Sequence, residues 1–218
     1  MSRNTAGPGS TPAEDRTLDY RPVLLAVAVA TAGVLPAFLT GGLAVQIRSE
    51  LDFGSAALGL AVAVFFLTVS LASVVMGRVV ERIGSHRAMR VSALGSTAAL
   101  LGTALFAWSW TWLVACLVFG GLANAVAQPA THLSLAREVP ANRQGLSFGI
   151  KQAAIPAATL LAGLAVPTIA VTLGWRWAFA GGAVLALGIS LLVPAETHRG
   201  VRKVREARAG DAPTAPLV

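Results

Sequence analysis

Six long apolar blocks separated by short polar segments dominate the hydrophobic pattern of the chain. A bilayer core about 30 Å thick is crossed by roughly 20 apolar residues in a helix, and each block reaches that length. The pattern therefore predicts an all-α membrane protein with six transmembrane helices. Their approximate ranges are 22–46, 55–77, 88–107, 111–135, 146–171 and 175–194.

Four prolines lie inside these blocks. Proline lacks a backbone donor and would break a soluble helix, but neighbouring helices can satisfy the freed carbonyl groups in a membrane. We therefore expect bends at Pro36, Pro129, Pro156 and Pro167.

The composition disfavours a water-soluble fold. Hydrophobic residues make up 55% of the chain and charged residues 12%, against roughly 25% charged in soluble domains. No Asp, Glu, Lys or Arg occurs from Val91 to Ala136. The net charge of +7 does not indicate nucleic acid, because the basic residues lie between the blocks and at the chain ends, where lipid head groups are expected. Cys116 is the single cysteine, so no disulfide or Cys-based metal site can form within the chain.

The basic residues predict the orientation. With a cytoplasmic N-terminus, fourteen of the 17 Lys and Arg residues fall on the cytoplasmic side, Arg48 and Arg176 fall outside, and Lys151 lies within a helix. All five tryptophans fall in the two outer connections, at the interface that this side chain prefers. We expect a bacterial inner (plasma) membrane protein with both termini in the cytoplasm.

Three regions follow from these patterns. Residues 1–20 are polar and rich in Pro, Gly, Ser and Thr, which predicts a disordered cytoplasmic tail. Residues 21–195 form the transmembrane domain, and the basic segment 196–218 is expected to be a cytoplasmic tail or a linker to a second half. The tetrapeptide at 41–44 (GGLA) recurs at 120–123, which is consistent with two three-helix repeats of inverted topology.

The connection after the second block is the most informative motif. It contains two glycines that permit a tight reversal and close helix approach, and an acid beside arginines that can form a latch at a helix end. Its key residues are Gly77, Glu81, Arg82, Gly84 and Arg87.

This connection resembles the signature loop between helices two and three of the major facilitator superfamily. Glu81 stands where Asp is usual, and Ser85 and His86 stand where further basic residues are common. The segments 35–36, 127–130 and 137–152 are similar to those of bacterial relatives of cyanate and nitrate-type permeases. The resemblance covers residues 20–195 and implies the N-terminal six-helix half of a transporter for a small solute.

The resemblance implies a conformational latch between Glu81 and Arg137. The alternative is a solvated turn that only sets topology, since exposed ion pairs contribute about 0–1 kcal/mol. The resemblance also directs helix four toward the translocation path. Asn124, Gln128 and His132 share one face of that helix, so they are candidates for the cavity or, alternatively, for hydrogen bonds between helices.

Lys151 lies about five residues inside the fifth block and is followed by Gln152. A charge within a membrane helix is a functional candidate, although a lysine near the helix end can also extend its ammonium to water. No Asp or Glu lies inside any block, so a proton relay of buried carboxylates is not expected here.

A major facilitator carrier normally has twelve helices, so this chain is expected to act with a second six-helix half, as a homodimer, or not at all if it is truncated. Its partners would be lipids and a small-molecule substrate. An intramembrane enzyme is not expected, since three histidines and one cysteine offer no converging catalytic groups, and no cofactor is expected. A scaffold without transport activity stays open as an alternative.

Overall fold

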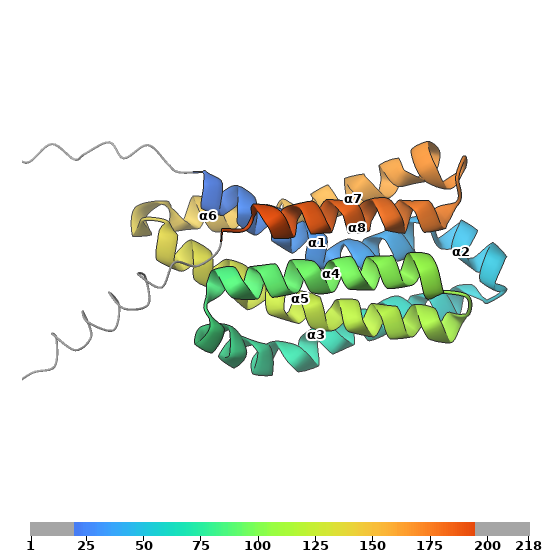
Figure 1. The fold of residues 1–218 in the computed structure, drawn as a ribbon, viewed down its shortest axis with the longest axis horizontal. Helices are drawn as coiled ribbons and strands as arrows, with labels where there is room; N and C mark the ends of the chain where they lie inside the picture. Colours follow the sequence, from blue (N-terminus) through green and yellow to red (C-terminus); the bar gives the residue numbers. More distant parts are fainter. Residues whose placement is uncertain (1–19, 195–218) are drawn as a thin grey trace, which may run out of the picture.

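The computed structural model describes residues 20–194 as a bundle of long, roughly parallel helices (Figure 1). The predicted tails at 1–20 and 196–218 lie outside the described residues, apart from residue 20. The helices in chain order are α1 (Arg21–Gly42), α2 (Ala44–Leu51), α3 (Ser55–Ile83), α4 (Ser85–Phe106), α5 (Trp110–Glu138), η1 (Ala141–Arg143), α6 (Gln144–Lys151), α7 (Ala154–Ala165), η2 (Val166–Ala170) and α8 (Trp175–Leu192).

Six segments of the described chain are long and apolar enough to cross a membrane, as predicted. Five are α1, α3, α4, α5 and α8, and the sixth, Ala141–Ala170, comprises η1, α6, α7 and η2. Three boundaries differ most from the prediction. The first block divides into α1 and the short helix α2, α3 continues to Ile83 instead of ending near residue 77, and the fifth segment begins at Ala141 instead of near residue 146.

The reversal between α3 and α4 takes place at one glycine. Gly84 ends α3 with φ +89° and ψ 155°, a conformation that costs other residues about 1–3 kcal/mol. Gly77 instead lies inside α3, and no described atom is within 4 Å of the position that its Cβ would occupy. Gly84 thus makes the reversal, and Gly77 does not approach another helix of the described bundle.

The helix contacts have the symmetry of two three-helix repeats. In two such repeats the fourth membrane helix corresponds to the first, and the fifth to the second. The first helix, α1, packs on the fifth, α7, and likewise the fourth helix, α5, packs on the second, α3. The first also packs on the sixth (α1 on α8), as the fourth packs on the third (α5 on α4). Gly121 permits one such contact, because a Cβ there would lie 2.8 Å from the Phe65 carbonyl oxygen. The predicted six-helix architecture is confirmed.

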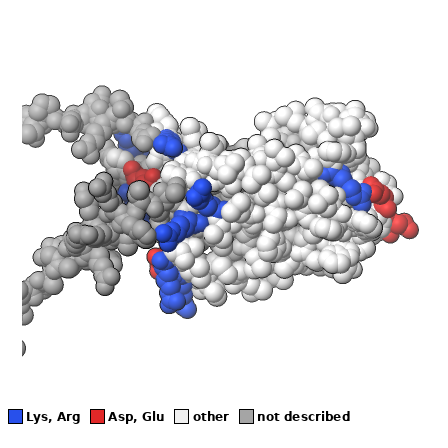
Figure 2. All heavy atoms as spheres, in the orientation of Figure 1, with Lys and Arg blue, Asp and Glu red and all other residues white. Residues whose placement is uncertain are grey.

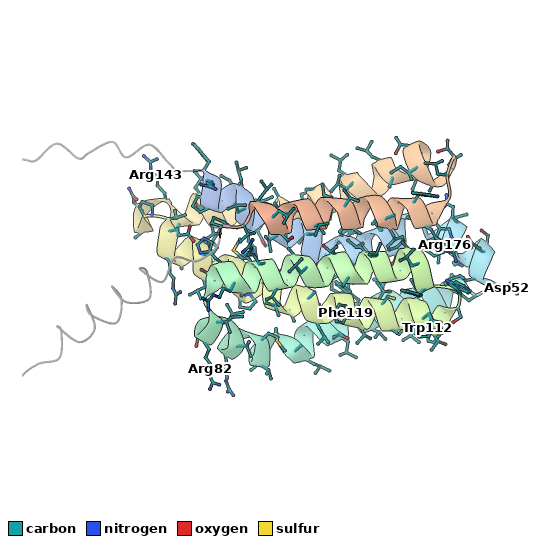
Figure 3. All side chains as sticks on the ribbon, in the orientation of Figure 1. Asp52, Arg82, Trp112, Phe119, Arg143 and Arg176 are labelled. Carbon is teal, nitrogen blue, oxygen red and sulfur yellow. The ribbon has the colours of Figure 1, made fainter. Side chains whose placement is uncertain are left out.

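Charged side chains gather at the two ends of the bundle (Figure 2). One end, here called the basic end, carries Arg82 and Arg143, and the other, the tryptophan end, carries Trp112, Arg176 and Asp52 (Figure 3). The surface between them shows no Lys, Arg, Asp or Glu on the face in view. This distribution matches a molecule whose middle lies in lipid and whose ends lie in the interfaces.

Candidate functional site

Lys151 is the only charged residue in the buried set of the described chain, with 2% of its surface exposed. Its ammonium donates to Gln128 Oε1 at 2.7 Å and lies 2.8 Å from His132 Nε2. The imidazole accepts from the ammonium when its proton resides on Nδ1. Lys151 therefore packs against α5 with little of its surface exposed.

The partners of Lys151 come from one face of α5. Gln128 and His132 are four residues apart, one turn of an α-helix, and both face α6. Phe148 packs edge-on against His132 with ring centroids 5.5 Å apart. Phe148 and Lys151 are three residues apart on α6, so one turn of α6 engages one turn of α5.

The fifth membrane helix is interrupted directly after Lys151. Helix α6 ends at Lys151, and α7 begins at Ala154 after a turn. Pro156 accounts for the interruption, because it has no N–H to donate to the Gln152 carbonyl oxygen. The Ile155 N–H reaches that oxygen instead, at 3.4 Å. Gln152 and Ala153 keep right-handed helical dihedrals, so the chain continues in the same direction through this two-residue turn.

The turn after Lys151 lines a cavity with a volume of about 480 Å³. Its walls are Gln128, His132, Phe148, Gly149, Lys151 and Gln152. This volume is typical of sites for small molecules. Four of the five residues predicted for substrate binding are thus brought together, because α5 and α6 present them to one another.

Asn124 lies elsewhere. It is 2% exposed and packs against α1, where its Oδ1 lies 2.6 Å from the position that a Gly33 Cβ would occupy. Its Oδ1 has no hydrogen-bond partner among the described residues. Asn124 does not line this cavity but lies in the α1–α5 interface.

The signature loop lies at the basic end of the bundle. Among residues 20–194, Glu81 and Arg137 do not form an ion pair with each other. Both side chains are exposed. His86, three residues into the same connection, instead lies 3.4 Å from Glu138 Oε1 at the end of α5. The Ser134 hydroxyl donates to the same oxygen at 2.5 Å. The sequence offered no signal for this contact, because His86 and Glu138 are distant along the chain.

A second polar cluster ties the tryptophan end together. Glu50 of α2 pairs with Arg176 of α8 and accepts from the Trp175 indole N–H at 2.5 Å. Arg176 also donates to the Ala107 carbonyl oxygen at 3.1 Å. The contacts within this cluster, Glu50–Trp175–Arg176, were likewise not predicted. From the sequence, its residues indicated only the position of the membrane interface.

Within residues 20–194 no group of three or more His, Cys, Asp or Glu side chains is arranged to hold a metal ion. The bundle of six long apolar segments defines the class: an all-α, multi-pass membrane protein.

Comparison with known proteins identifies the family. Residues 22–218 match the sequence model of the Major Facilitator Superfamily, and the chain belongs to this family of transporters. An uncharacterised MFS-type transporter of Mycobacterium tuberculosis is 27% identical over 156 residues, which are 70% of this chain and 27% of that protein. The chain thus matches about a quarter of the relative's length.

A solved structure agrees with the fold. The crystal structure of a D-xylose-proton symporter matches with a TM-score of 0.70 and 18% identity, over 89% of this chain and 53% of the symporter chain. The described bundle is therefore one six-helix half of a major facilitator fold. The recognition of the family from the signature loop is confirmed.

Proposed function

We propose that this chain contributes to secondary transport of a small solute by alternating access, with the solute bound between α5 and the interrupted fifth helix. The observation that carries the proposal is the burial of Lys151 beside a polar cavity. A charged side chain within a membrane helix is costly, and such residues are rare outside functional sites. The buried position of Lys151 therefore favours a functional site over a scaffold.

The proposal includes a second six-helix bundle. The fifth segment and α3 are the least buried membrane segments, with 28% and 11% of their apolar windows inside the described bundle, against 72% for α1. The fifth helix also presents small side chains every four residues, at Gly145, Gly149 and Ala153. Such a stripe allows another helix to approach closely in a membrane. The partner is a separate second half or another copy of this chain.

The basic end is proposed to face the cytoplasm of a bacterial plasma membrane, in agreement with the positive-inside rule. Glu81 and Arg137 are proposed to form their latch with the second bundle or in the other access state, because both are exposed at this end. We expect Glu81→Gln to leave insertion intact and to shift the balance between inward-facing and outward-facing states.

Sided labelling of a cysteine at Gln152 tests alternating access. Gln152 is exposed and lines the cavity, and Cys116→Ser supplies a cysteine-free background. A membrane-impermeant maleimide should modify Gln152→Cys from both faces of oriented vesicles. Glu81→Gln should raise the rate of modification from one face of the vesicles and lower the rate from the other face.

Asn142→Cys is the matched control. Asn142 is exposed in η1 at the basic end, so its cysteine should react from one face alone. The competing function is an assembly scaffold without transport. Reaction of Gln152→Cys from a single face, unchanged by Glu81→Gln, would favour the scaffold and contradict the transport proposal.

A further inference from the structure

The groups around Lys151 place a nucleophile beside its own base, and we infer that Lys151 captures an aldehyde from the cavity as a covalent imine. The inference goes beyond the proposed function, since covalent capture requires neither transport nor a second bundle. It is drawn from the positions of Gln128, His132, Phe148 and Gln152 around one amine. The product is a stoichiometric adduct, without turnover.

The Lys151 amine belongs to the cavity wall and has no carboxylate partner among residues 20–194. A carboxylate in contact would favour the charged ammonium, which has no lone pair and cannot attack carbon. The partners of the amine are instead an amide and an imidazole, which carry no negative charge. Desolvation of a lysine in such surroundings is one of the ways in which proteins activate an amine as a nucleophile.

His132 supplies the base. Its Nε2 lies 2.8 Å from Lys151 Nζ, within hydrogen-bond reach of the proton that must leave. Phe148 orients the imidazole, because its ring packs edge-on against His132 with 5.5 Å between centroids. A nucleophile, a base in contact with it and a third group that orients the base form the arrangement typical of covalent chemistry in proteins.

Gln128 and Gln152 have separate parts in the step. Gln128 Oε1 accepts an N–H of the Lys151 amine at 2.7 Å and can hold the nitrogen in place while the bond forms. Gln152 is exposed on the same cavity wall, so its amide N–H is available to the carbonyl oxygen of an aldehyde. A hydrogen bond to that oxygen stabilises the negative charge that develops on it during attack.

The atoms of the step balance without an oxidant or a reductant. His132 Nε2 takes one proton from the Lys151 ammonium, and rotation about the Cε–Nζ bond turns the freed lone pair toward the cavity. The nitrogen attacks the aldehyde carbon, a C–N bond forms, and the carbonyl oxygen receives the proton from His132. The nitrogen gives a second proton to this hydroxyl group, the C–O bond breaks, and water leaves. The protonated imine keeps one N–H, which donates to Gln128.

The cavity favours a small aldehyde with an apolar group. Its volume of about 480 Å³ is typical of sites for small molecules. Phe148 and the bare backbone at Gly149 form an apolar wall beside the amine. Benzaldehyde is a suitable probe, because it joins the electrophilic carbon to one flat apolar ring.

Reductive trapping on the 218-residue chain in detergent tests the inference. Cyanoborohydride delivers a hydride to the imine carbon and leaves a stable benzyl group on the lysine, which peptide mass spectrometry locates. The chain contains two lysines, Lys151 and Lys203, so Lys203 reports ordinary amine reactivity. Lys151 should be modified at least about tenfold faster than Lys203, because a general base contributes about 10²–10⁴-fold. Its rate should saturate as the benzaldehyde concentration rises.

Benzyl alcohol is the matched competitor, since it has the same ring without an electrophilic carbon. It should slow the modification of Lys151 and leave that of Lys203 unchanged. Equal rates at the two lysines would overturn the inference. So would a Lys151 rate that does not saturate and that benzyl alcohol does not slow.

The variant His132→Ala tests the base. Modification of Lys151 should slow at least about tenfold, and free imidazole, which fits the space left by the side chain, should restore part of the rate at Lys151 without changing that at Lys203. His86→Ala, which removes an imidazole at the basic end, should leave the rate unchanged. An unaltered rate in His132→Ala, or a loss that imidazole does not restore, would contradict the role of His132. The trapping experiment on the unaltered chain stands even where His132→Ala does not fold.

The two proposals fail separately. Fast, saturable capture at Lys151 with one-sided labelling at Gln152→Cys would keep the aldehyde site and remove alternating access. Two-sided labelling with equal modification of Lys151 and Lys203 would keep transport and remove covalent capture.

Discussion

The Lys151 ammonium hydrogen-bonds two side chains of α5, Gln128 and His132. We therefore expect each of these partners to contribute to stability. Gln128→Leu would remove the 2.7 Å acceptor from a buried ammonium. Hydrogen bonds to charged groups contribute about 1.5–3 kcal/mol, and we expect a loss of that size in the free energy of unfolding. Gln152→Leu, at an exposed position of the same cavity, should cost less than about 0.5 kcal/mol.

Chemical unfolding in detergent would measure both variants. Adding Lys151→Met to Gln128→Leu replaces both partners with apolar groups and should recover part of the loss, since no unpaired charge is then left buried. Equal stability of Gln128→Leu and the unaltered chain would show that the amide oxygen is not a necessary partner.

Gly33 is required by the buried side chain of Asn124. A Cβ at Gly33 would lie 2.6 Å from Asn124 Oδ1 and 3.3 Å from Ala127 Cβ. Overpacking of this kind costs about 1–3 kcal/mol, so Gly33→Ala should lower the thermal midpoint. Gly41→Ala, where no described atom lies within 4 Å, should not. In an Asn124→Ala background the cost of Gly33→Ala should shrink, which a double-mutant cycle would detect.

At the scale of elements, the α3–α4 reversal depends on backbone conformation. Gly84→Ala would force a side chain into φ +89° and should cost about 1–3 kcal/mol. Gly77→Ala should be neutral or stabilising by about 0.5–1 kcal/mol, because Gly77 lies in open space inside a helix. Denaturant titration of the two single variants would compare them. Equal losses in the free energy of unfolding for the two variants would mean that the backbone conformation of Gly84 is not the source of its effect.

The elements themselves were largely predictable, and the reasons are physical. Helix length and apolarity are local properties, so all six membrane segments were found. Pro156 predicted a bend, and the structure places a two-residue turn between α6 and α7 just before it. Helix α2 was missed because its residues continue the apolar pattern of α1 through Leu43. The π-helical segment η2, Val166–Ala170, was also missed, since Pro167 alone does not specify which hydrogen bonds replace the lost one.

The candidate site was predictable in its residue types but not in its contacts. Lys151, Gln128 and His132 stood out because polar groups are rare in apolar blocks. Helical spacing alone placed Asn124 with them, although its side chain faces α1. The contact between His86 and Glu138 joins residues 52 positions apart along the chain. Such pairings depend on how the helices rotate when they pack.

At the scale of the whole molecule, the cluster Glu50–Trp175–Arg176 joins the tryptophan ends of the first and sixth membrane segments. Glu50→Ala would remove the partner of both Trp175 and Arg176. Because the Glu50 side chain is half exposed, we expect a loss of only about 1 kcal/mol, smaller at high salt. Asp52→Asn at the same end should have no measurable effect. A Glu50→Ala loss that does not change with salt would indicate that the ion pair is not its source.

The proposed second bundle makes a prediction about cross-linking. Gly145→Cys in the Cys116→Ser background places a thiol on the exposed stripe of the fifth helix. Mild oxidation in membranes should give a disulfide-linked dimer if another copy of the chain packs there, and an adduct with a different six-helix chain if a separate half does. Val184→Cys, on an exposed position of α8, is the control. If Gly145→Cys forms no more cross-linked adduct than Val184→Cys, the proposal that the second bundle packs on this stripe is contradicted.

The scarcity of lysine in this arginine-rich chain makes the buried ammonium accessible to spectroscopy. With one lysine inside the described bundle and Lys203 beyond it, selective isotopic enrichment of lysine would give a two-signal spectrum. One resonance would report the interior of the cavity, and the other would serve as the reference.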